Sequence, residues 1–568
     1  MKQVAIKLNG KKIKCNEGAS VLQVAIDHNI EIPHFCYHED LPIDANCRVC
    51  LVEVDGKVMT SCTLKAQAGL AVKLNTPAVA KLRKENMELL LAGHTQRCPK
   101  CQKNYACQTR EQMEKYGVTG KKYERPCLNL PIHKMGSAAE FDPEQCIGCN
   151  KCVEMCQKIG IGFLQLKGQA AKNSLAITDD KCVDCIYCGQ CTVHCPVAAV
   201  REQNQIEQVK AALKDKSKIV IAQCAPSVRC SIGEEFGVKP GTNLMGEINT
   251  ALRQLGFDRV FDVNMGADIT TWVEAKELVE RIKNGGPFPM FTSCCPGWVK
   301  MAEFYYPAML EHLTTARSPQ IHSGGAYKTW WAEEEGIDPH NIVVVSLMPC
   351  TSKKYEAQMD KFKVDGHRPV DYVLTTREFA VLLKDQNIDL PKLKKSTVDP
   401  YGTFSGAAAI YGASGGVMES ALRTAYHFLT GKELKKVEFK QVRGMQGVKR
   451  ATIAINGHKL KVAVVATAAN VKLIMEEIKK DPNAYHYIEV MSCPGGCIGG
   501  GGQPIPSTER IIAQRIAGLY QIDDKMQVRC AHKNPIVRRY MEEYIPSLPE
   551  HKQRELLYTS YSKKKRFE

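Results

Sequence analysis

The placement of cysteine constrains this chain more than any other feature, because 19 of its 26 cysteines stand in short, ordered groups. Disulfide frameworks with this many cysteines are typical of small secreted domains. This chain has 568 residues, and its first 15 residues lack the apolar core of a secretion signal. In a reducing compartment, grouped cysteines are thiolate ligands of zinc or of iron–sulfur clusters. We therefore expect a cytoplasmic metalloprotein of several domains. No apolar run reaches the ~18 residues that would span a membrane.

The first cysteine group lies in a small α+β module at residues 1–78. Apolar and polar residues alternate from Val4 to Leu8, Asn9-Gly10 has turn chemistry, and strand patterns recur at 50–54 and 70–74. The cysteines of this module have the spacing C-x10-C-x2-C-x11-C and are Cys36, Cys47, Cys50 and Cys62. Four thiolates in so small a module fit one 2Fe–2S cluster, and a four-cysteine zinc site is the alternative.

The second group combines one histidine with three cysteines. It follows a helical pattern at residues 78–92 and has the spacing H-x3-C-x2-C-x5-C, with His94, Cys98, Cys101 and Cys107. One imidazole and three thiolates are a common zinc set, so the ligand chemistry alone favours zinc at this site.

Two copies of one repeat form the third group. Each copy has the spacing C-x2-C-x2-C-x3-C, and the members are Cys146, Cys149, Cys152 and Cys156, then Cys185, Cys188, Cys191 and Cys195. This double run is the bacterial two-cluster ferredoxin pattern, in which the fourth cysteine of each run ligates the other cluster. It predicts two 4Fe–4S clusters, with Cys195 completing the first set and Cys156 completing the second.

From about residue 206 the pattern changes to alternating strands and helices. The expected strands are continuous apolar runs at 218–222, 259–263, 289–292, 342–346, 462–465 and 487–490. Such runs are typical of a parallel sheet that is covered on both faces. Three of them end in cysteine-bearing turns, FTSCCPGW, SLMPCTSKK and EVMSCPGGCIGGGG. Because open α/β sheets build their sites at the carboxyl ends of strands, these turns predict a four-cysteine site in a crevice.

The three turns resemble the three loops of the catalytic domain of FeFe hydrogenases. The first two cysteine groups resemble the 2Fe–2S and His/Cys3 4Fe–4S domains that this family shares with the large electron-input subunit of respiratory complex I. The resemblance covers nearly all of the chain and implies reversible reduction of protons to dihydrogen, with electrons relayed through accessory clusters to and from ferredoxin. It implies a multidomain α+β and α/β fold. Three domains would carry the accessory clusters: a β-grasp 2Fe–2S ferredoxin domain (1–78), a His/Cys3 4Fe–4S domain (79–137) and a bacterial two-cluster 4Fe–4S ferredoxin domain (138–205). They would be followed by an α/β catalytic domain (206–530) that holds the six-iron catalytic group, called the H-cluster, and by a C-terminal helical tail (531–568).

The resemblance also implies which residues hold the H-cluster. Its 4Fe–4S part would be held by Cys295, Cys350, Cys493 and Cys497. Cys497 would also bridge to a di-iron subsite that carries CO, cyanide and an azadithiolate and is supplied by maturation proteins. Around the subsite, the resemblance implies a cation at Lys353 and polar contacts from Ser227 and Gln320. Pro226, Met348 and Met491 would also contact the subsite, with the two methionines as adaptable wall residues. By residue type alone, a loop lysine is usually solvated and a methionine usually fills a core.

A proton relay is implied as well, with Cys294 as the first donor. It runs outward through Cys294, Glu274, Thr314, Glu277 and Arg281. On a helix, Glu274, Glu277 and Arg281 share one face. The residue pattern alone predicts that this face is solvated, and only the resemblance makes it a relay. The family usually has serine where Thr314 stands, and a pocket phenylalanine where Tyr411 stands.

The charge of the chain favours one class of partner. The formal charge is +16, and five metal clusters with their thiolates lower it to roughly +7. Basic residues are not interleaved with aromatic ones, so we do not expect nucleic acid to bind. A small acidic carrier such as ferredoxin fits better, because opposite charges raise encounter rates.

Three alternatives follow from parts of the pattern. The first is an electron-input subunit of complex I, but such a subunit lacks the turn at 292–298. The second is a non-catalytic protein, either an iron–sulfur assembly factor, which lacks the 2Fe–2S module, or a sensory hydrogenase, which typically replaces the residue equivalent to Cys294. The third alternative, which the sequence leaves open, is the catalytic subunit of an NAD-linked, electron-bifurcating complex with flavoprotein partners. Six cysteines lack ligand spacing and are expected to be buried apolar residues or idle thiols: Cys15, Cys127, Cys182, Cys224, Cys230 and Cys530.

Overall fold

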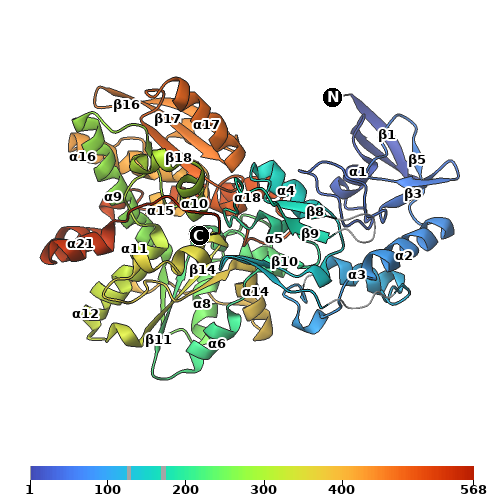
Figure 1. Ribbon diagram of the computed structural model, residues 1–568, viewed down its shortest axis with the longest axis horizontal. Helices are drawn as coiled ribbons and strands as arrows, with labels where there is room; N and C mark the ends of the chain where they lie inside the picture. The colour runs from blue at the N-terminus through green and yellow to red at the C-terminus, as the bar shows by residue number, and fades with distance from the viewer. Residues whose placement is uncertain (1, 106, 124–128, 168–173, 568) are drawn as a thin grey trace.

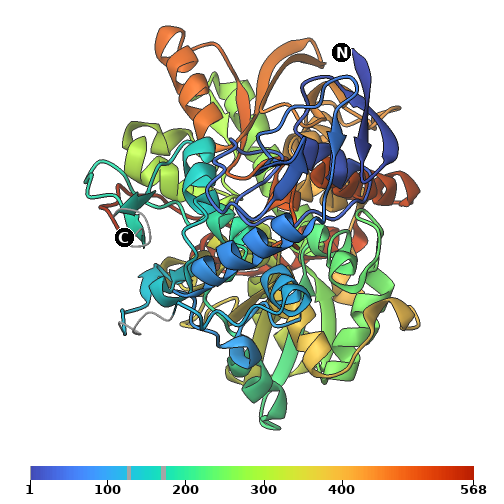
Figure 2. The same ribbon diagram turned by 90° about the vertical axis from the view of Figure 1, so that its right-hand side faces the viewer.

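The computed structural model describes residues 2–105, 107–123, 129–167 and 174–567. The N-terminal module lies at one end of the longest axis and the α/β region at the other, with the segment of about residues 140–205 between them (Figure 1). Seen from the N-terminal end, the module and the long helix that follows it lie in front of the α/β region (Figure 2). Cys127 falls outside the described residues.

The N-terminal module is a small sheet with one helix packed against it. Its sheet has the strand order β2-β1-β5, and β3 pairs with β4 around the Asp55-Gly56 turn. The helix begins after Ser20, whose hydroxyl accepts a hydrogen bond from the amide of Gln23 and so caps the helix. The bounds are β1 (Gln3–Leu8), β2 (Lys11–Asn16), α1 (Val21–Asp27), β3 (Leu51–Val54), β4 (Lys57–Thr60) and β5 (Ala71–Val72).

Two helices and a compact unit of short elements connect this module to the α/β region. The first helix begins at Pro77 after the cap Thr76, as expected for proline at a first helical position. The unit that follows contains the sheet β10-β7-β6 and the hairpin β8-β9. The bounds are α2 (Pro77–Leu91), α3 (Gln108–Tyr116), β6 (His133–Met135), β7 (Ala139–Phe141), α4 (Lys151–Ile159), β8 (Leu164–Lys167), β9 (Ser174–Ile177), α5 (Gln190–His194) and β10 (Val200–Glu202).

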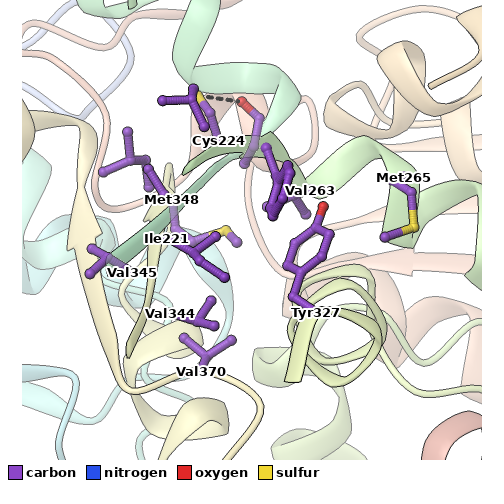
Figure 3. Packing of buried hydrophobic residues seen from close by; sticks show 14 of the residues in the cluster. Ile221, Cys224, Val263, Met265, Tyr327, Val344, Val345, Met348 and Val370 are labelled. Carbon is purple, nitrogen blue, oxygen red and sulfur yellow. Dashed lines mark hydrogen bonds between the residues drawn. The ribbon is translucent and has the colours of Figure 1, made fainter. Parts of the chain in front are cut away.

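The α/β region is built on two sheets rather than one. One has the order β12-β11-β14-β15 with every pair parallel, and the other has the order β13-β18-β17-β16. The strands are β11 (Ile219–Cys224), β12 (Arg259–Asp262), β13 (Met290–Phe291), β14 (Ile342–Met348), β15 (Tyr372–Thr375), β16 (Val448–Ile455), β17 (His458–Ala466) and β18 (Tyr487–Met491). Figure 3 shows part of the core on the first sheet, where Ile221 of β11 packs near Val344 and Val345 of β14.

Helices cover these sheets. Up to the end of β18 they are α6 (Ile206–Lys214), α7 (Pro226–Arg229), α8 (Met245–Leu255), α9 (Val263–Asn284), α10 (Pro296–Tyr305), α11 (Pro319–Ala326), α12 (Ala332–Glu335), α13 (Ser352–Ala357), α14 (Thr376–Asp385), α15 (Gly406–Ala409), α16 (Gly416–Thr430) and α17 (Ala468–Lys480). After β18 they are α18 (Glu509–Lys525), α19 (Pro535–Arg539), α20 (Ile545–Ser547) and α21 (Glu550–Leu557).

The six predicted strands are present, and those that pair with one another are parallel. The sequence did not reveal that they divide between two sheets, or that β16, which was not predicted, runs antiparallel to β17. An apolar run reports that a strand is covered on both faces, but it does not report which strands pair. The hairpin β16-β17 turns at Asn456-Gly457, where both residues have positive φ. This dipeptide is a strong hairpin signal, and it was available in the sequence.

The chain end returns across the molecule after α21. The Lys564 amide donates to the Glu303 carbonyl at 3.0 Å, and the Phe567 amide donates to the Asp184 carboxylate at 3.1 Å. The tail thus joins α10 of the α/β region to the loop before Cys185. Among the described residues, no helix combines the length and the apolar character that crossing a membrane requires.

Candidate functional site

Four cysteines from three strand ends converge between the two sheets. Cys295 caps α10 after β13, Cys350 follows β14, and Cys493 and Cys497 lie in the turn after β18. Burial first, and then the neighbouring thiols Cys295 and Cys350, raise the pKa of Cys497. A buried thiolate that faces other thiolates is unstable unless a cation offsets the charge. The convergence therefore fits a metal cluster.

The backbone of the last turn is shaped for close contact. Gly496 has φ +95°, and a Cβ there would lie 2.6 Å from the Ser414 amide nitrogen. Only glycine adopts this conformation at low cost while another chain segment lies so near. The turn can therefore bring Cys493 and Cys497 to the same point as Cys295 and Cys350.

A cavity of about 60 Å³ adjoins two of the four cysteines, Cys350 and Cys497. It is lined by Cys294, Cys350 and Cys497 together with Pro226, Ser227, Gln320, Met348, Lys353, Tyr411 and Met491. Within the described part of the chain, Ser227 Oγ and Gln320 Oε1 are buried and have no hydrogen-bond partner. Such atoms cost free energy unless a bound group satisfies them. These residues therefore fit a polar group bound beside the cysteines.

Lys353 reaches this cavity from α13. Its Nζ donates to Glu356 Oε2 at 2.7 Å and to the Cys294 carbonyl at 3.0 Å. Burial opposes the charge, but Glu356 together with Cys294 and Cys350 outweighs it, so the pKa of Lys353 is raised. The side chain is only 10% exposed. The lysine is thus a buried cation, whereas its residue type alone predicted a solvated one.

Cys294 lies on the wall of the same cavity. Burial raises the pKa of its thiol well above the ordinary value, and Glu274 and Cys497 raise it further. The thiol therefore keeps its proton at neutral pH, and Lys353 only partly opposes this effect. A protonated thiol on the wall of this cavity is chemically able to donate a proton to a group bound there.

Glu274 corrects the prediction of a solvated helix face. It lies on α9 with 0% exposure, and burial raises its pKa to about 8. Its Oε1 accepts a hydrogen bond from the Tyr487 hydroxyl at 2.8 Å. Its Oε2 is buried and has no partner among the residues that the structure describes. The pattern misled because α9 is covered on almost every side, so polar residues on this helix do not mark a solvent face.

The outer part of the predicted relay is connected by hydrogen bonds. The Thr314 hydroxyl donates to Glu277 Oε2 at 2.7 Å, and Arg281 donates to Glu277 Oε1 at 2.7 Å. Arg281 is 8% exposed, so this end lies just beneath the surface. In the described chain no direct hydrogen bond joins Glu274 to Thr314 or to Cys294. A bridging water is the ordinary way to cross such a gap.

The four cysteines of the N-terminal module also face one another. The Cys36 thiol donates to Cys47 Sγ at 3.3 Å and lowers the pKa of Cys47 to about 6. Cys62 lowers the pKa of Cys50 to about 7 in the same way. All four side chains are buried. They form two thiol pairs that fit one four-thiolate cluster.

His94 is oriented by a hydrogen bond from outside its cysteine group. Its Nδ1 lies 2.8 Å from the Gln145 carbonyl, and burial lowers its pKa. A carbonyl can only accept, so Nδ1 carries the proton and Nε2 keeps a lone pair. His94 shares a cavity with Cys98, Cys101 and Cys107. This geometry fits a neutral imidazole ligand.

The two ferredoxin-like runs exchange their fourth cysteines in space. After burial, the pKa of Cys152 is raised by Cys149, Cys195 and Cys146. That of Cys191 is raised by the burial of its thiol and then by Cys188, Cys185 and Cys156. Cys195 therefore lies with the first run and Cys156 with the second.

The second run lies directly beside the four cysteines of the α/β region. The Cys493 thiol approaches the Cys188 carbonyl at 3.9 Å, and the Thr192 hydroxyl donates to the Gly501 carbonyl at 2.7 Å. A Cβ at Gly501 would lie 2.5 Å from the Cys188 oxygen and from the Gly189 Cα. Because only glycine permits this approach, the two cluster sites are held next to each other.

Three residues around the cavity were missed by sequence reasoning. Glu356 accepts hydrogen bonds from Lys353, Gln320 and Ser318, so one carboxylate fixes three side chains of the site. Its spacing of three residues from Lys353 on α13 was an available signal. Ser492 bonds to Cys295 at 3.4 Å and stands next to Cys493. Tyr487 gave no signal, because it looks like an ordinary strand residue.

The remaining cysteines separate into two kinds. Cys15, Cys224, Cys230 and Cys530 are buried, as small apolar residues are, whereas Cys182 is exposed. Burial raises the pKa of Cys530 to about 11. These thiols take no part in the cysteine groups described above.

Protein-family models match most of the chain. The C-terminal domain of the iron-only hydrogenase large subunit matches residues 218–501. A 2Fe–2S cluster binding domain matches residues 1–77, and the iron–sulfur binding region of NADH-ubiquinone oxidoreductase-G matches residues 83–122. The iron hydrogenase small subunit matches residues 509–564.

Two individual proteins are similar over the full length, and a solved structure is similar over part of it. Iron hydrogenase 1 from Clostridium pasteurianum is 41% identical, covering 98% of this chain and 100% of that protein. The NADP-reducing hydrogenase subunit HndD from Solidesulfovibrio fructosivorans is 38% identical over 100% of both. A solved structure of the FeFe hydrogenase HydA1 from Chlamydomonas reinhardtii is 36% identical with a TM-score of 0.57, and the match covers 64% of this chain and 99% of that one.

Proposed function

The chain belongs to the iron-only hydrogenase family and is an iron hydrogenase, and from this premise we propose how its residues divide the reversible conversion of protons and electrons to dihydrogen. The observation that carries the proposal is the set of four convergent cysteines beside a cavity with unpartnered polar atoms on Ser227 and Gln320. The six-iron group that fits there supplies the metal at which protons and dihydrogen are interconverted. Everything else in the reaction is delivery and positioning by the protein.

We assign cofactor holding to the walls of this cavity. Cys295, Cys350, Cys493 and Cys497 would hold the 4Fe–4S part, and Cys497 would bridge to the di-iron subsite with its CO, cyanide and azadithiolate ligands. Lys353 presents a buried cation to an anionic ligand, which is worth more in a site that excludes water. Ser227 and Gln320 offer polar contacts, while Pro226, Met348 and Met491 form the apolar wall.

Proton delivery falls to Cys294 and the residues behind it. The thiol keeps its proton beside the cavity and is regenerated by Glu274, whose pKa of about 8 lets it both take and give a proton near neutral pH. Glu277, bonded to Thr314 and Arg281, would carry the proton to the surface. Support for this route comes from these contacts and from the burial of Glu274.

Electron delivery falls to the accessory clusters. We propose one 2Fe–2S cluster, a His94/Cys3 4Fe–4S cluster and two ferredoxin-type 4Fe–4S clusters on the cysteines described above. The set at Cys185, Cys188, Cys191 and Cys156 would be the last step before the catalytic group, because Cys188 lies against Cys493. The division at residues 1–78, 79–137, 138–205, 206–530 and 531–568 is part of this proposal. With the catalytic group, the enzyme would hold roughly 20 iron atoms.

Ferredoxin is the electron carrier that we propose, and di-iron maturation proteins would complete the active site. A second candidate is the catalytic subunit of an NAD-linked, electron-bifurcating complex, which the full-length similarity to HndD favours. Purification from the host and identification of co-eluting subunits distinguishes the two. A free-standing chain supports the ferredoxin-linked enzyme, whereas stable flavoprotein partners support the complex.

The proposal is tested by separating cluster assembly from di-iron assembly. Expressed without maturation proteins, the chain should contain its accessory clusters yet evolve no dihydrogen, and a synthetic di-iron complex should restore activity. Metal analysis of the same protein tests His94, because zinc there would replace four irons. Activity in the unmatured protein would contradict the assignment of the catalytic group.

A further inference from the structure

A group of metal-ligating side chains lies outside every site described so far. His427 is in the last turn of α16, Glu433 follows the end of that helix, and His532 is in the short helix at Ala531–Lys533. His427 Nδ1 lies 3.1 Å from Glu433 Oε1, and His532 Nε2 lies 3.2 Å from Glu433 Oε2. One ligand atom from each residue lies within 4.8 Å of the other two. This spacing is compatible with three ligands on one ion.

The two imidazoles are held in a fixed mutual orientation. Their rings are stacked at 4.3 Å with an interplanar angle of 7°. The Nδ1 of His532 lies 3.3 Å from the Thr424 hydroxyl, so Nε2 points to the carboxylate. Metal-ligating histidines commonly use their second nitrogen in this way.

The environment favours the metal-binding state as well. Burial, and then the facing His427, lower the pKa of His532, although Glu433 opposes this. Lys533 Nζ lies 3.0 Å from Glu433 Oε2 and pairs with that oxygen. The other oxygen, Oε1, lies 3.1 Å from His427 Nδ1 and is the one that an ion would use. The side chains of His427 and Glu433 are 35% and 44% exposed, so an ion can enter from solvent and keep a water ligand.

We propose that His427, Glu433 and His532 bind one Zn²⁺ ion, with solvent in the remaining position. Two imidazoles, one carboxylate and an open position are a recognised zinc set. Ni²⁺ and Co²⁺ also accept imidazole and are the competing ions. No cysteine takes part, which separates this site from the iron–sulfur chemistry of the chain.

The position of the site gives zinc a structural effect. The ion would join α16 to the segment after Cys530, and two residues beyond His532 the Asn534 amide donates to Asp268 of α9 at 2.9 Å. Helix α9 also carries Glu274. An ion that binds only the folded chain stabilises it by mass action. Zinc should therefore raise the unfolding temperature of this region without changing the iron content.

The experiment uses matured enzyme under anaerobic conditions, with ZnCl₂ as the probe. Zinc per chain is measured by equilibrium dialysis for the wild type, His427→Gln, Glu433→Gln and the control His340→Gln. His340 is a matched control because it is exposed, lies 3.0 Å from Asp338 and has its ring 4.2 Å from that of His367. The wild type and control should bind one more zinc than the other two variants, and only they should show the zinc-dependent rise in unfolding temperature.

Diffraction from zinc-soaked crystals, measured on both sides of the zinc absorption edge, locates the ion and distinguishes it from iron. A peak between His427, Glu433 and His532 supports the proposal. Equal zinc binding by the wild type and His427→Gln, or an anomalous peak only at cysteines, would overturn it. His427 and Glu433 are partly exposed, so these variants should fold, and unchanged hydrogenase activity and iron content verify this.

Discussion

The region before residue 206 and the α/β region after it build their metal sites in opposite ways. In the first, ligands are neighbours in sequence: Cys185, Cys188 and Cys191 fall within one short run. In the second, Cys295 and Cys493 are about 200 residues apart and meet only because two sheets place their strand ends together. A local site needs the correct spacing, whereas a long-range site needs the whole fold.

The two regions also differ in whether their side chains suit the transfer of electrons or of protons. The first offers cysteine sites that end at Cys188, which lies against Cys493, and so suits electron transfer. The second offers buried acid groups, Cys294 and Glu274, and a hydrogen-bonded exit at Glu277, and so suits proton transfer. We expect substitutions in each region to disturb one flow and spare the other.

The largest effect is expected at Cys294. Cys294→Ala should keep the full iron content and the carbonyl infrared bands, but lose turnover by about 10²–10⁴-fold, the typical contribution of general acid catalysis. Cys294→Asp restores an ionisable group and should recover part of the rate. Loss of the cluster in Cys294→Ala would mean that Cys294 and Cys295 have exchanged roles. Wild-type turnover would show that the relay is wrong.

A smaller loss is expected at Glu277. Glu277→Gln keeps the shape of the side chain, but an amide cannot pass a proton on, so turnover should fall by roughly 10-fold or more. Glu280→Gln is the matched control, because Glu280 is exposed on the same helix. Steady-state dihydrogen evolution measures both. Equal rates in the two variants would remove Glu277 from the path and leave the outer end of the relay undefined.

The smallest effect is a pH dependence of stability at Glu274. Its folded pKa of about 8 lies above its ordinary value of 4.5, so the folded chain holds a proton that the unfolded chain releases. The stabilisation is fully present below the ordinary pKa and is lost as the pH rises through about 8. The unfolding temperature of the wild type relative to Glu274→Gln should therefore fall between pH 5 and pH 8.5. A difference that stays flat over this range would contradict the raised pKa.

The same comparison explains how much the sequence could predict. The spacing of Cys36, Cys47, Cys50 and Cys62 was sufficient to predict a single site, because the module that holds them is short. The three cysteine-bearing turns were predicted to lie together because each follows an apolar strand, and the structure places them after β13, β14 and β18. The fold class and the hydrogenase family were confirmed by the comparisons.

The residue pattern could not predict contacts between residues that are far apart in the sequence. Glu274 was expected to be solvated on pattern alone, because polar spacing on α9 does not reveal that other elements cover this helix. The division into two sheets was missed for the same reason, since an apolar strand does not specify its partners. Tyr487 was identified only from its hydrogen bond to Glu274.

The central claim is that electrons and protons reach one catalytic site from different regions, and isotope exchange tests it most directly. Exchange between dihydrogen and D₂O moves no net electrons, whereas carrier-linked evolution requires the accessory clusters. In matured enzyme with intact carbonyl infrared bands, Cys188→Ala should lose carrier-linked evolution and retain exchange, while Cys294→Ala should lose both. Parallel loss of exchange and evolution in Cys188→Ala, or retained exchange in Cys294→Ala, would contradict the claim.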